Sequence, residues 1–214
     1  MRLTAANQIT LLRIILIIPF VLCMVEANHS SFGTIYRYIA LGIFVVMAVS
    51  DAVDGYLARV KKQATRLGSF LDPMADKLLI TCACILLASQ RFAVPGFRLP
   101  LEVVILILGK DALLCLGFMT LYFMTGDVRI APVWVGKLAT FLQLVMVASI
   151  LIAPEMTRWL PGWALWVPIC WWSAGGVAIL AVAIYIYGGL RYINQLEQQQ
   201  NRQEDAEKGQ TGKK

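Results

Sequence analysis

Four aspartates stand close together in the stretch DAVDGYLARVKKQATRLGSFLDPMAD, residues 51–76. Asp51 and Asp54 are three residues apart, and Asp72 and Asp76 are four apart, so each pair would share one face of a helix. Four carboxylates gathered at one place repel one another unless a cation lies between them. The stretch contains no His or Cys, and oxygen ligands alone suit hard divalent ions such as Mg²⁺ or Mn²⁺. The spacing therefore predicts a metal site of two ions about 3.5–4 Å apart, an arrangement that clamps a phosphoryl group.

The same stretch holds residues that fit a phosphate ligand: Gly55, Arg59, Lys61, Lys62, Arg66 and Gly68. The glycines let a ligand approach the backbone, and the cations supply positive charge. Arg59 is the candidate for a pyrophosphate because it follows Asp54 closely. Lys61 and Lys62 are expected to set the topology or to contact anionic lipid headgroups. Ca²⁺ stays an alternative to Mg²⁺, although the spacing is not that of an EF-hand loop.

The composition places these charges in an apolar chain. Of the 214 residues, 59% are hydrophobic and only 15% are charged, and the mean hydropathy is +0.70. These values predict an integral membrane protein in contact with membrane lipids, and nothing in the sequence points to a nucleic acid partner. The five cysteines all fall in apolar stretches, so neither a disulfide framework nor a zinc site is expected.

Six apolar runs have the length of about 20 residues that a helix needs to cross a bilayer. They are residues 9–25, 35–53, 70–88, 101–124, 134–153 and 164–190. The predicted fold class is therefore an all-α polytopic membrane protein with six transmembrane helices. Residues 1–190 form the membrane domain, and residues 191–214 form a polar tail that begins as a helix and becomes disordered.

The distribution of Lys and Arg predicts the orientation, because cytoplasmic loops carry more of both. One side of the predicted membrane collects most of these residues, including those of residues 59–66 and of the polar tail, while the other side collects only Arg37, Arg91, Arg98 and Arg158. Both termini are expected in the cytoplasm. The predicted metal site then lies at the cytoplasmic ends of the second and third helices.

The residues of this stretch match a known pattern. Asp51, Asp54, Gly55, Ala58, Arg59, Gly68, Asp72 and Asp76 reproduce D-x2-D-G-x2-A-R-x8-G-x3-D-x3-D without a departure, and the chain thereby resembles the CDP-alcohol phosphatidyltransferases. The resemblance extends from Asn7 to about Leu190. It implies an enzyme of phospholipid biosynthesis, in which an acceptor hydroxyl attacks the β-phosphorus of a CDP-linked lipid and CMP is released. It also implies a homodimer in a bacterial inner membrane.

The resemblance implies roles for individual residues. Asp51, Asp54 and Asp72 would bind one metal ion, and Asp51, Asp72 and Asp76 the other. Asp76 would also accept the proton of the attacking hydroxyl. The CDP-lipid contacts implied by the family pattern are Gly55, Ala58, Arg59, Thr65, Gly68 and the N-terminal pair Asn7 and Thr10.

The acceptor is the open part of this expectation. The passages NQITLLRIILI and LGSFLDPMADKLL resemble family members that use glycerol-3-phosphate, which we favour. The passages GKDALLCLGF and VRIAPVWVGKLATFLQLVMVASILIAP resemble the CMP-forming cardiolipin synthases, whose acceptor is phosphatidylglycerol.

The candidate contacts for the acceptor's phosphate are Arg66, Lys110, Arg129 and Lys137. A structural role, such as a contact to a lipid headgroup, is an equal alternative for the last three. Lys110 is the most suggestive of them, because it lies deep in the fourth apolar run and Asp111 is not expected on its face. An unpaired ammonium there would be costly.

Two other classes of protein are weaker alternatives. An ion-coupled transporter could use buried carboxylates, but the sequence shows neither paired, interrupted helices nor two similar halves. A purely structural membrane scaffold would leave the four aspartates unexplained.

Overall fold

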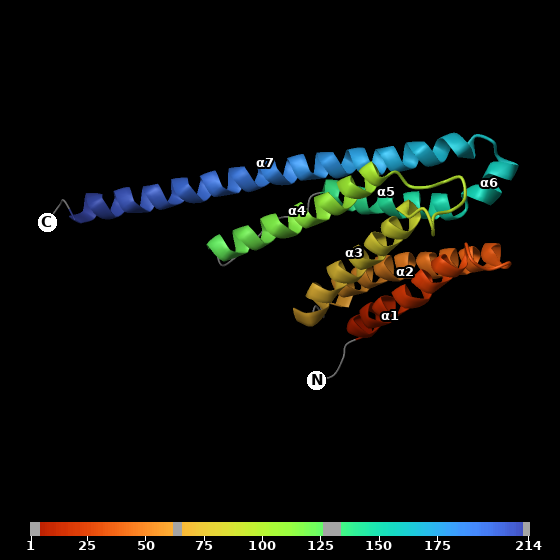
Figure 1. Ribbon diagram of the computed structural model, residues 1–214. Coiled ribbons are helices and arrows are strands. Elements are labelled where there is room, and N and C mark those ends of the chain that lie inside the picture. The colour runs from red at the N-terminus through yellow and green to blue at the C-terminus, as the bar shows by residue number, and fades with distance from the viewer. Residues whose placement is uncertain (1–4, 62–65, 126–133, 212–214) are drawn as a thin grey trace.

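The computed structural model describes the backbone of residues 5–61, 66–125 and 134–211, and the side chains of residues 11–50, 77–117, 119 and 134–191. The described ranges contain seven helices and no strand (Figure 1). The helices are α1 (Ala5–Glu26), α2 (Gly33–Lys61), α3 (Arg66–Ala88), α4 (Leu101–Thr125), α5 (Trp134–Leu151), α6 (Ala153–Trp159) and α7 (Trp163–Thr211). The all-α class is confirmed.

Five of the six predicted apolar runs each fall within one long helix, and the run 134–153 does not. The run predicted to reach residue 153 ends as α5 at Leu151, and the chain then forms the short helix α6, where a connection was expected. Pro154 explains the break, because it has no N–H to donate to the carbonyl of Ile150 and its ring would clash there. The same proline is tolerated in the first turn of α6, where an N–H would have no partner within the helix.

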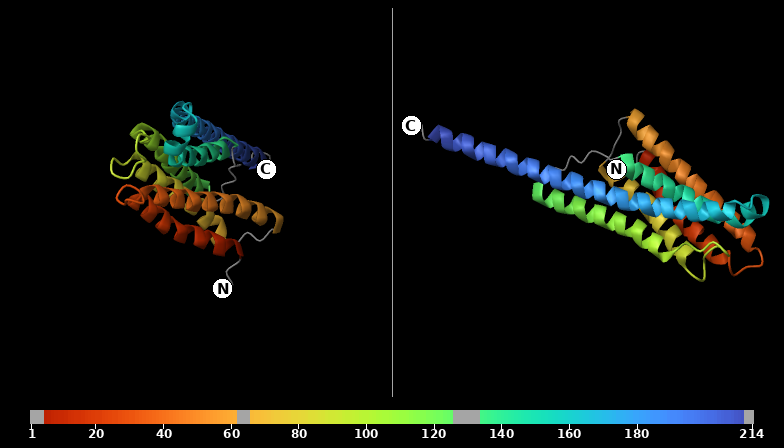
Figure 2. Two further views of the ribbon diagram at one scale, coloured as in Figure 1. Left: turned by 90° about the vertical axis from the view of Figure 1, so that its right-hand side faces the viewer. Right: turned by 90° about the horizontal axis from the view of Figure 1, so that it is seen from above.

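The last helix is longer than a membrane crossing. α7 continues as one helix from Trp163 to Thr211, and Figure 2 shows its C-terminal part extending well beyond the other helices. The helical beginning of the polar tail is therefore present. The domain boundary at residue 190 and the disordered end of the tail stay predictions.

Three helical segments among the described residues are long and apolar enough to cross a membrane. They are Gly33–Ser50, Trp134–Leu151 and Trp163–Arg191. Many large apolar side chains of α1 also point outward, among them Leu12, Ile15 and Ile18. Apolar residues on the outer face of a helix suit a lipid environment. The chain is therefore a membrane protein. Six crossings were expected, and three of them stay predictions.

The helices form two packed groups that meet in one core. α1 packs against α2 and α3, while α7 packs against α4 and α5. α5 also contacts α2 and α3, which joins the two groups. The core contains Phe20 and Phe44, whose ring centroids are 6.0 Å apart, together with buried side chains of α3, α4, α5 and α7.

The connections at one end of the bundle are held by polar contacts. The Asn28 side chain, between α1 and α2, donates to the carbonyl of Ala93, between α3 and α4, over 3.0 Å. Arg37 of α2 forms an ion pair with Glu155 of α6. Both side chains of this pair are mostly buried, with 10% and 20% of their surface exposed. These contacts fix the end of the bundle opposite to the two chain termini (Figure 1).

Candidate active site

The aspartate pattern is divided between two consecutive helices. Asp51 and Asp54 lie on α2, and Asp72 and Asp76 lie on α3. α2 ends at Lys61 and α3 begins at Arg66, so the two helix ends are five residues apart and can be separated by at most about 18 Å. The backbone therefore brings both halves of the pattern to the same end of the bundle, as the sequence predicted.

The side chains of this pattern lie outside the described part of the structure, and their predicted roles stay predictions. The same holds for most of the other predicted site residues. The predictions left untested in this way concern Asn7, Thr10, Asp51, Asp54, Gly55, Ala58, Arg59, Thr65, Arg66, Gly68, Asp72, Asp76 and Arg129. Among the residues whose side chains are described, no group of three or more His, Cys, Asp or Glu residues could hold a metal ion.

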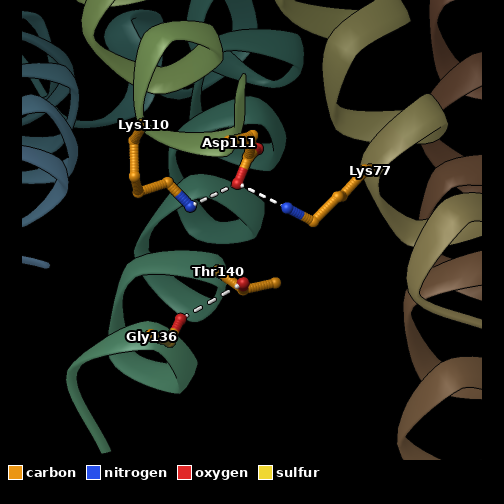
Figure 3. A network of polar contacts seen from close by, with 5 residues as sticks. All are labelled: Lys77, Lys110, Asp111, Gly136 and Thr140. Atoms are coloured by element: carbon orange, nitrogen blue, oxygen red, sulfur yellow. Dashed lines mark hydrogen bonds and ion pairs between the residues drawn. The ribbon is translucent and has the colours of Figure 1, made fainter. Parts of the chain in front are cut away.

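A network of three charged side chains lies inside the described part, next to the pattern in the sequence. The ammonium of Lys77 on α3 lies 3.0 Å from Oδ1 of Asp111 on α4. The ammonium of Lys110 lies 2.8 Å from the same oxygen. Figure 3 shows Asp111 between the two lysines, with Lys77 reaching across from the neighbouring helix. One carboxylate oxygen therefore binds two cations from two helices.

The network lies partway along both helices. Lys110 is nine residues from the start of α4 and Lys77 eleven from the start of α3, which places them roughly 14 and 17 Å along their helices. The side chain of Lys110 is 5% exposed, that of Asp111 15% and that of Lys77 44%. Lys110 is thus the most enclosed charge of the three.

The prediction for Lys110 was right about burial and wrong about its partner. Consecutive helical residues point about 100° apart, and this geometry suggested that Asp111 could not neutralise Lys110. The lysine side chain is long enough to bend around the helix, however, and its ammonium reaches Oδ1 of Asp111 (Figure 3). Lys110 is therefore a paired ammonium.

Lys137 is in a different environment. It is exposed on α5, with its ammonium 5.8 Å from the ring centroid of Trp134. This distance is typical of a cation–π contact, which Trp favours more than other aromatic residues. One turn further along the same helix, the Thr140 hydroxyl donates to the carbonyl of Gly136 over 3.3 Å (Figure 3). Lys137 thus has a structural contact, and an acceptor role for it stays a prediction.

A cavity of about 240 Å³ lies at the other end of the bundle, beside the connection between α1 and α2. Its lining includes Asn28, Ser31, Thr34 and Arg37. The arginine is already neutralised by Glu155. The α1–α2 connection, which lines this cavity, lies at the end of the bundle away from the start of α3, the helix that carries the second half of the aspartate pattern (Figure 1).

Comparison with known proteins decides between the phosphatidyltransferase, the transporter and the structural scaffold. Residues 3–187 match the CDP-alcohol phosphatidyltransferase family. The chain belongs to this family. The match covers α1 to α6 in full and stops at Tyr187 within α7. The chain is therefore an enzyme of a transferase family, and the transporter and scaffold alternatives are not retained.

Individual relatives of this CDP-alcohol phosphatidyltransferase are similar over nearly their whole length. The CDP-diacylglycerol–glycerol-3-phosphate 3-phosphatidyltransferase of Escherichia coli (strain K12) is 30% identical over 201 residues, which cover 91% of this chain and 95% of the relative. Proteins with the same name from Shigella sonnei (strain Ss046) and Shigella boydii serotype 4 (strain Sb227) have the same identity and coverage.

Lys77 and its partner Asp111 are not among the site residues that the sequence predicts for this CDP-alcohol phosphatidyltransferase. Lys77 directly follows Asp76 and lies in a largely apolar helix. A lysine in such a position needs a counter-charge, and Asp111 was an available carboxylate in the next helix. That requirement was the signal that could have predicted their contact.

Proposed function

We propose that the chain transfers the phosphatidyl group of CDP-diacylglycerol to glycerol-3-phosphate and releases CMP. The observation that carries this proposal is the complete aspartate pattern on α2 and α3, in a chain that is similar over nearly its whole length to a glycerol-3-phosphate-dependent relative. The buried cation Lys110 supports an acceptor that carries its own phosphate. Phosphatidylglycerol, the acceptor of cardiolipin synthases, is the alternative that the experiment must distinguish.

In the proposed reaction a hydroxyl oxygen of the acceptor forms a bond to the β-phosphorus of CDP-diacylglycerol. The bond from this phosphorus to the oxygen shared with the α-phosphate breaks, and CMP leaves with that oxygen. Asp76 accepts the proton of the attacking hydroxyl. Gly55, Ala58, Arg59, Thr65, Gly68, Asn7 and Thr10 hold the CDP-lipid, and Arg66, Lys110, Arg129 and Lys137 are the proposed contacts to the acceptor.

The chemistry of the four aspartates fits the divalent ions expected for this family. Asp51, Asp54, Asp72 and Asp76 offer only carboxylate oxygens, the ligands that Mg²⁺ and Mn²⁺ prefer. When bound, two such ions would neutralise the pyrophosphate and stabilise the charge of departing CMP. Asp51 and Asp72 would contact both ions, Asp54 the first and Asp76 the second.

The proposed enzyme crosses the bilayer six times, with α1 to α5 and the first part of α7 as the crossing helices. Both termini and the aspartate pattern face the cytoplasm, where glycerol-3-phosphate is soluble. The excess of Lys and Arg on that side supports this orientation. We also propose that the enzyme acts as a homodimer in a bacterial inner membrane, on the basis of the family pattern alone.

The test measures CMP release from CDP-diacylglycerol by purified protein with Mg²⁺, with glycerol-3-phosphate and phosphatidylglycerol compared as acceptors. We expect a clear preference for glycerol-3-phosphate, and loss of activity on chelation that Mg²⁺ or Mn²⁺ restores. Asp76→Asn should lower kcat by about 10²–10⁴-fold, the range for removal of a general base. A control variant, Glu155→Gln, changes a distant ion pair and should keep its activity.

The outcomes separate the alternatives. A preference for phosphatidylglycerol would replace the proposed acceptor and make the enzyme a cardiolipin synthase. Full activity of Asp76→Asn would instead contradict the proposed proton acceptor, whichever acceptor is used.

A further inference from the structure

We infer that Asp111 and Lys77 are positioning residues for the acceptor, and that Asp111 holds Lys110 at a fixed place relative to the helix that carries Asp72 and Asp76. This inference rests on the proposed function, because it gives Lys110 the acceptor's phosphate as its partner. It adds two residues that were not among the predicted site residues. Their role is indirect: Lys77 acts on Asp111, and Asp111 acts on Lys110.

The two lysines share one carboxylate oxygen of Asp111. Oδ1 of Asp111 accepts a hydrogen bond from Lys77 across the α3–α4 boundary and forms an ion pair with Lys110 on its own helix. A carboxylate that paired with Lys110 alone could rotate with it. The contact to Lys77 anchors Asp111 to α3, so the position of the Lys110 ammonium is fixed relative to α3 as well (Figure 3).

The network has more positive than negative charges. Among the described side chains, the two ammonium groups and the one carboxylate carry a net charge of +1, and the ammonium of Lys77, whose side chain is 44% exposed, remains open to solvent. A partly exposed cluster with a net positive charge attracts an anion. The phosphate of glycerol-3-phosphate is such an anion. Asp111 therefore neutralises part of the charge and leaves one positive charge for the acceptor.

Lys77 is adjacent in the chain to the proposed proton acceptor. Lys77 directly follows Asp76 on α3. Its ion pair with Asp111 therefore joins α3 to α4 one residue after Asp76. The two reactants must be aligned to within about 1 Å for rapid transfer, and errors of that size can cost about 10²-fold in rate. A contact between the two helices at this point maintains their alignment.

The experiment is a double-mutant cycle with Lys77→Met, Asp111→Asn and the double variant, each assayed for the KM of glycerol-3-phosphate, the KM of CDP-diacylglycerol and kcat. We expect Lys77→Met to raise the KM of glycerol-3-phosphate about tenfold while the KM of CDP-diacylglycerol stays within about twofold, since misplacing a group by a fraction of 1 Å costs less than 10²-fold. Lys77→Arg keeps the cation and should restore most of the loss. In the Asp111→Asn background, Lys77→Met should have little further effect, because Lys77 acts through Asp111.

Controls separate positioning from simple stabilisation. The midpoint of thermal unfolding is measured for the same variants without substrate, and Glu155→Gln serves as a matched control at the other end of the bundle. Glu155→Gln should lower the unfolding midpoint and leave the KM of glycerol-3-phosphate unchanged. If the Lys77 and Asp111 variants behave like this control, or if their effects on KM are additive, the positioning role is wrong.

Failure of the proposed acceptor is recognisable from the wild-type protein. If wild type prefers phosphatidylglycerol, the same cycle is measured on the KM of that acceptor, which also carries a phosphate. Coupling there would keep the positioning role with a different substrate. The two substitutions could instead be non-additive in the unfolding midpoint and additive in the KM of every acceptor. The network would then be a structural contact only, and the inference would be overturned.

Discussion

Gly33 begins α2 in direct contact with the backbone near the end of α1. A Cβ atom at this position would overlap the carbonyl oxygen of Ala27. The neighbouring backbone is held by further contacts, since the N–H of Gly33 donates to the carbonyl of Ser30 over 3.0 Å. The tight connection between α1 and α2 therefore depends on the absence of a side chain at this one residue.

We expect Gly33→Ala to destabilise the protein by about 1–3 kcal/mol, because the connection must move to relieve the overlap. Gly42→Ala is the matched control on the same helix, since a Cβ there would meet nothing within 4 Å. Alanine has the higher helix propensity, so the control should be neutral or slightly stabilising. Thermal unfolding in detergent measures both, and equal midpoints for the two variants would contradict the assignment.

The charged residues inside the bundle are stabilised by ion pairs. Lys77, Lys110 and Asp111 are each unfavourable alone within apolar helices, and they are tolerated because they neutralise one another. Arg37 and Glu155 do the same at the other end of the bundle. These five charged side chains are thus placed where a partner of opposite charge is available.

At the scale of the elements, the contact between α4 and α7 depends on a small residue. Gly175 of α7 is buried, and a Cβ there would lie 3.3 Å from Cδ1 of Leu106 and 3.9 Å from the side chain of Val103. Small residues let helices in a membrane approach closely, and dispersion contacts then supply much of the attraction between them. The next residue, Gly176, is exposed and has no such neighbour within 4 Å.

We expect Gly175→Val to destabilise the protein more than Gly176→Val by about 1–3 kcal/mol. Both changes place the same residue in the same helix, so the difference reports the packing against α4. The measurement is the unfolding midpoint of the two variants in one detergent. Similar midpoints would mean that α4 moves away from α7 without cost.

At the scale of the whole molecule, the two ends of the bundle have different character. The end with the α1–α2 and α3–α4 connections and α6 is held by the pairs Asn28–Ala93 and Arg37–Glu155. The opposite end carries both termini, the start of α3 and the extended part of α7 (Figures 1 and 2). We propose that this second end faces the cytoplasm.

The proposed orientation predicts the labelling of single cysteines introduced into a variant whose five native cysteines are replaced. Lys214→Cys should react with a membrane-impermeant thiol reagent only after the cells are permeabilised. Ser31→Cys, in the exposed α1–α2 connection, should react in intact cells. The reverse pattern would show that the termini lie outside and would contradict the charge-based prediction.

Much of the fold was readable from the sequence, because each apolar run of about 20 residues has one favourable conformation in a bilayer, which is a helix. The run before Pro154 shows the limit of that argument. The apolar run continues to residue 153, but α5 ends at Leu151 because the proline has no N–H to donate. The chain then starts a new helix, α6, at Ala153.

The sequence alone determined the family and the helices that carry the four aspartates, because these depend on residue types and on spacing within single helices. The tertiary structure decided the partners of the buried charges. Asp111 and Lys77 are 34 residues apart, and their contact exists only because α3 and α4 pack side by side at that depth. Lys110 reaches Asp111 because a long side chain can bend around its own helix, which the direction of the Cα–Cβ bond does not predict.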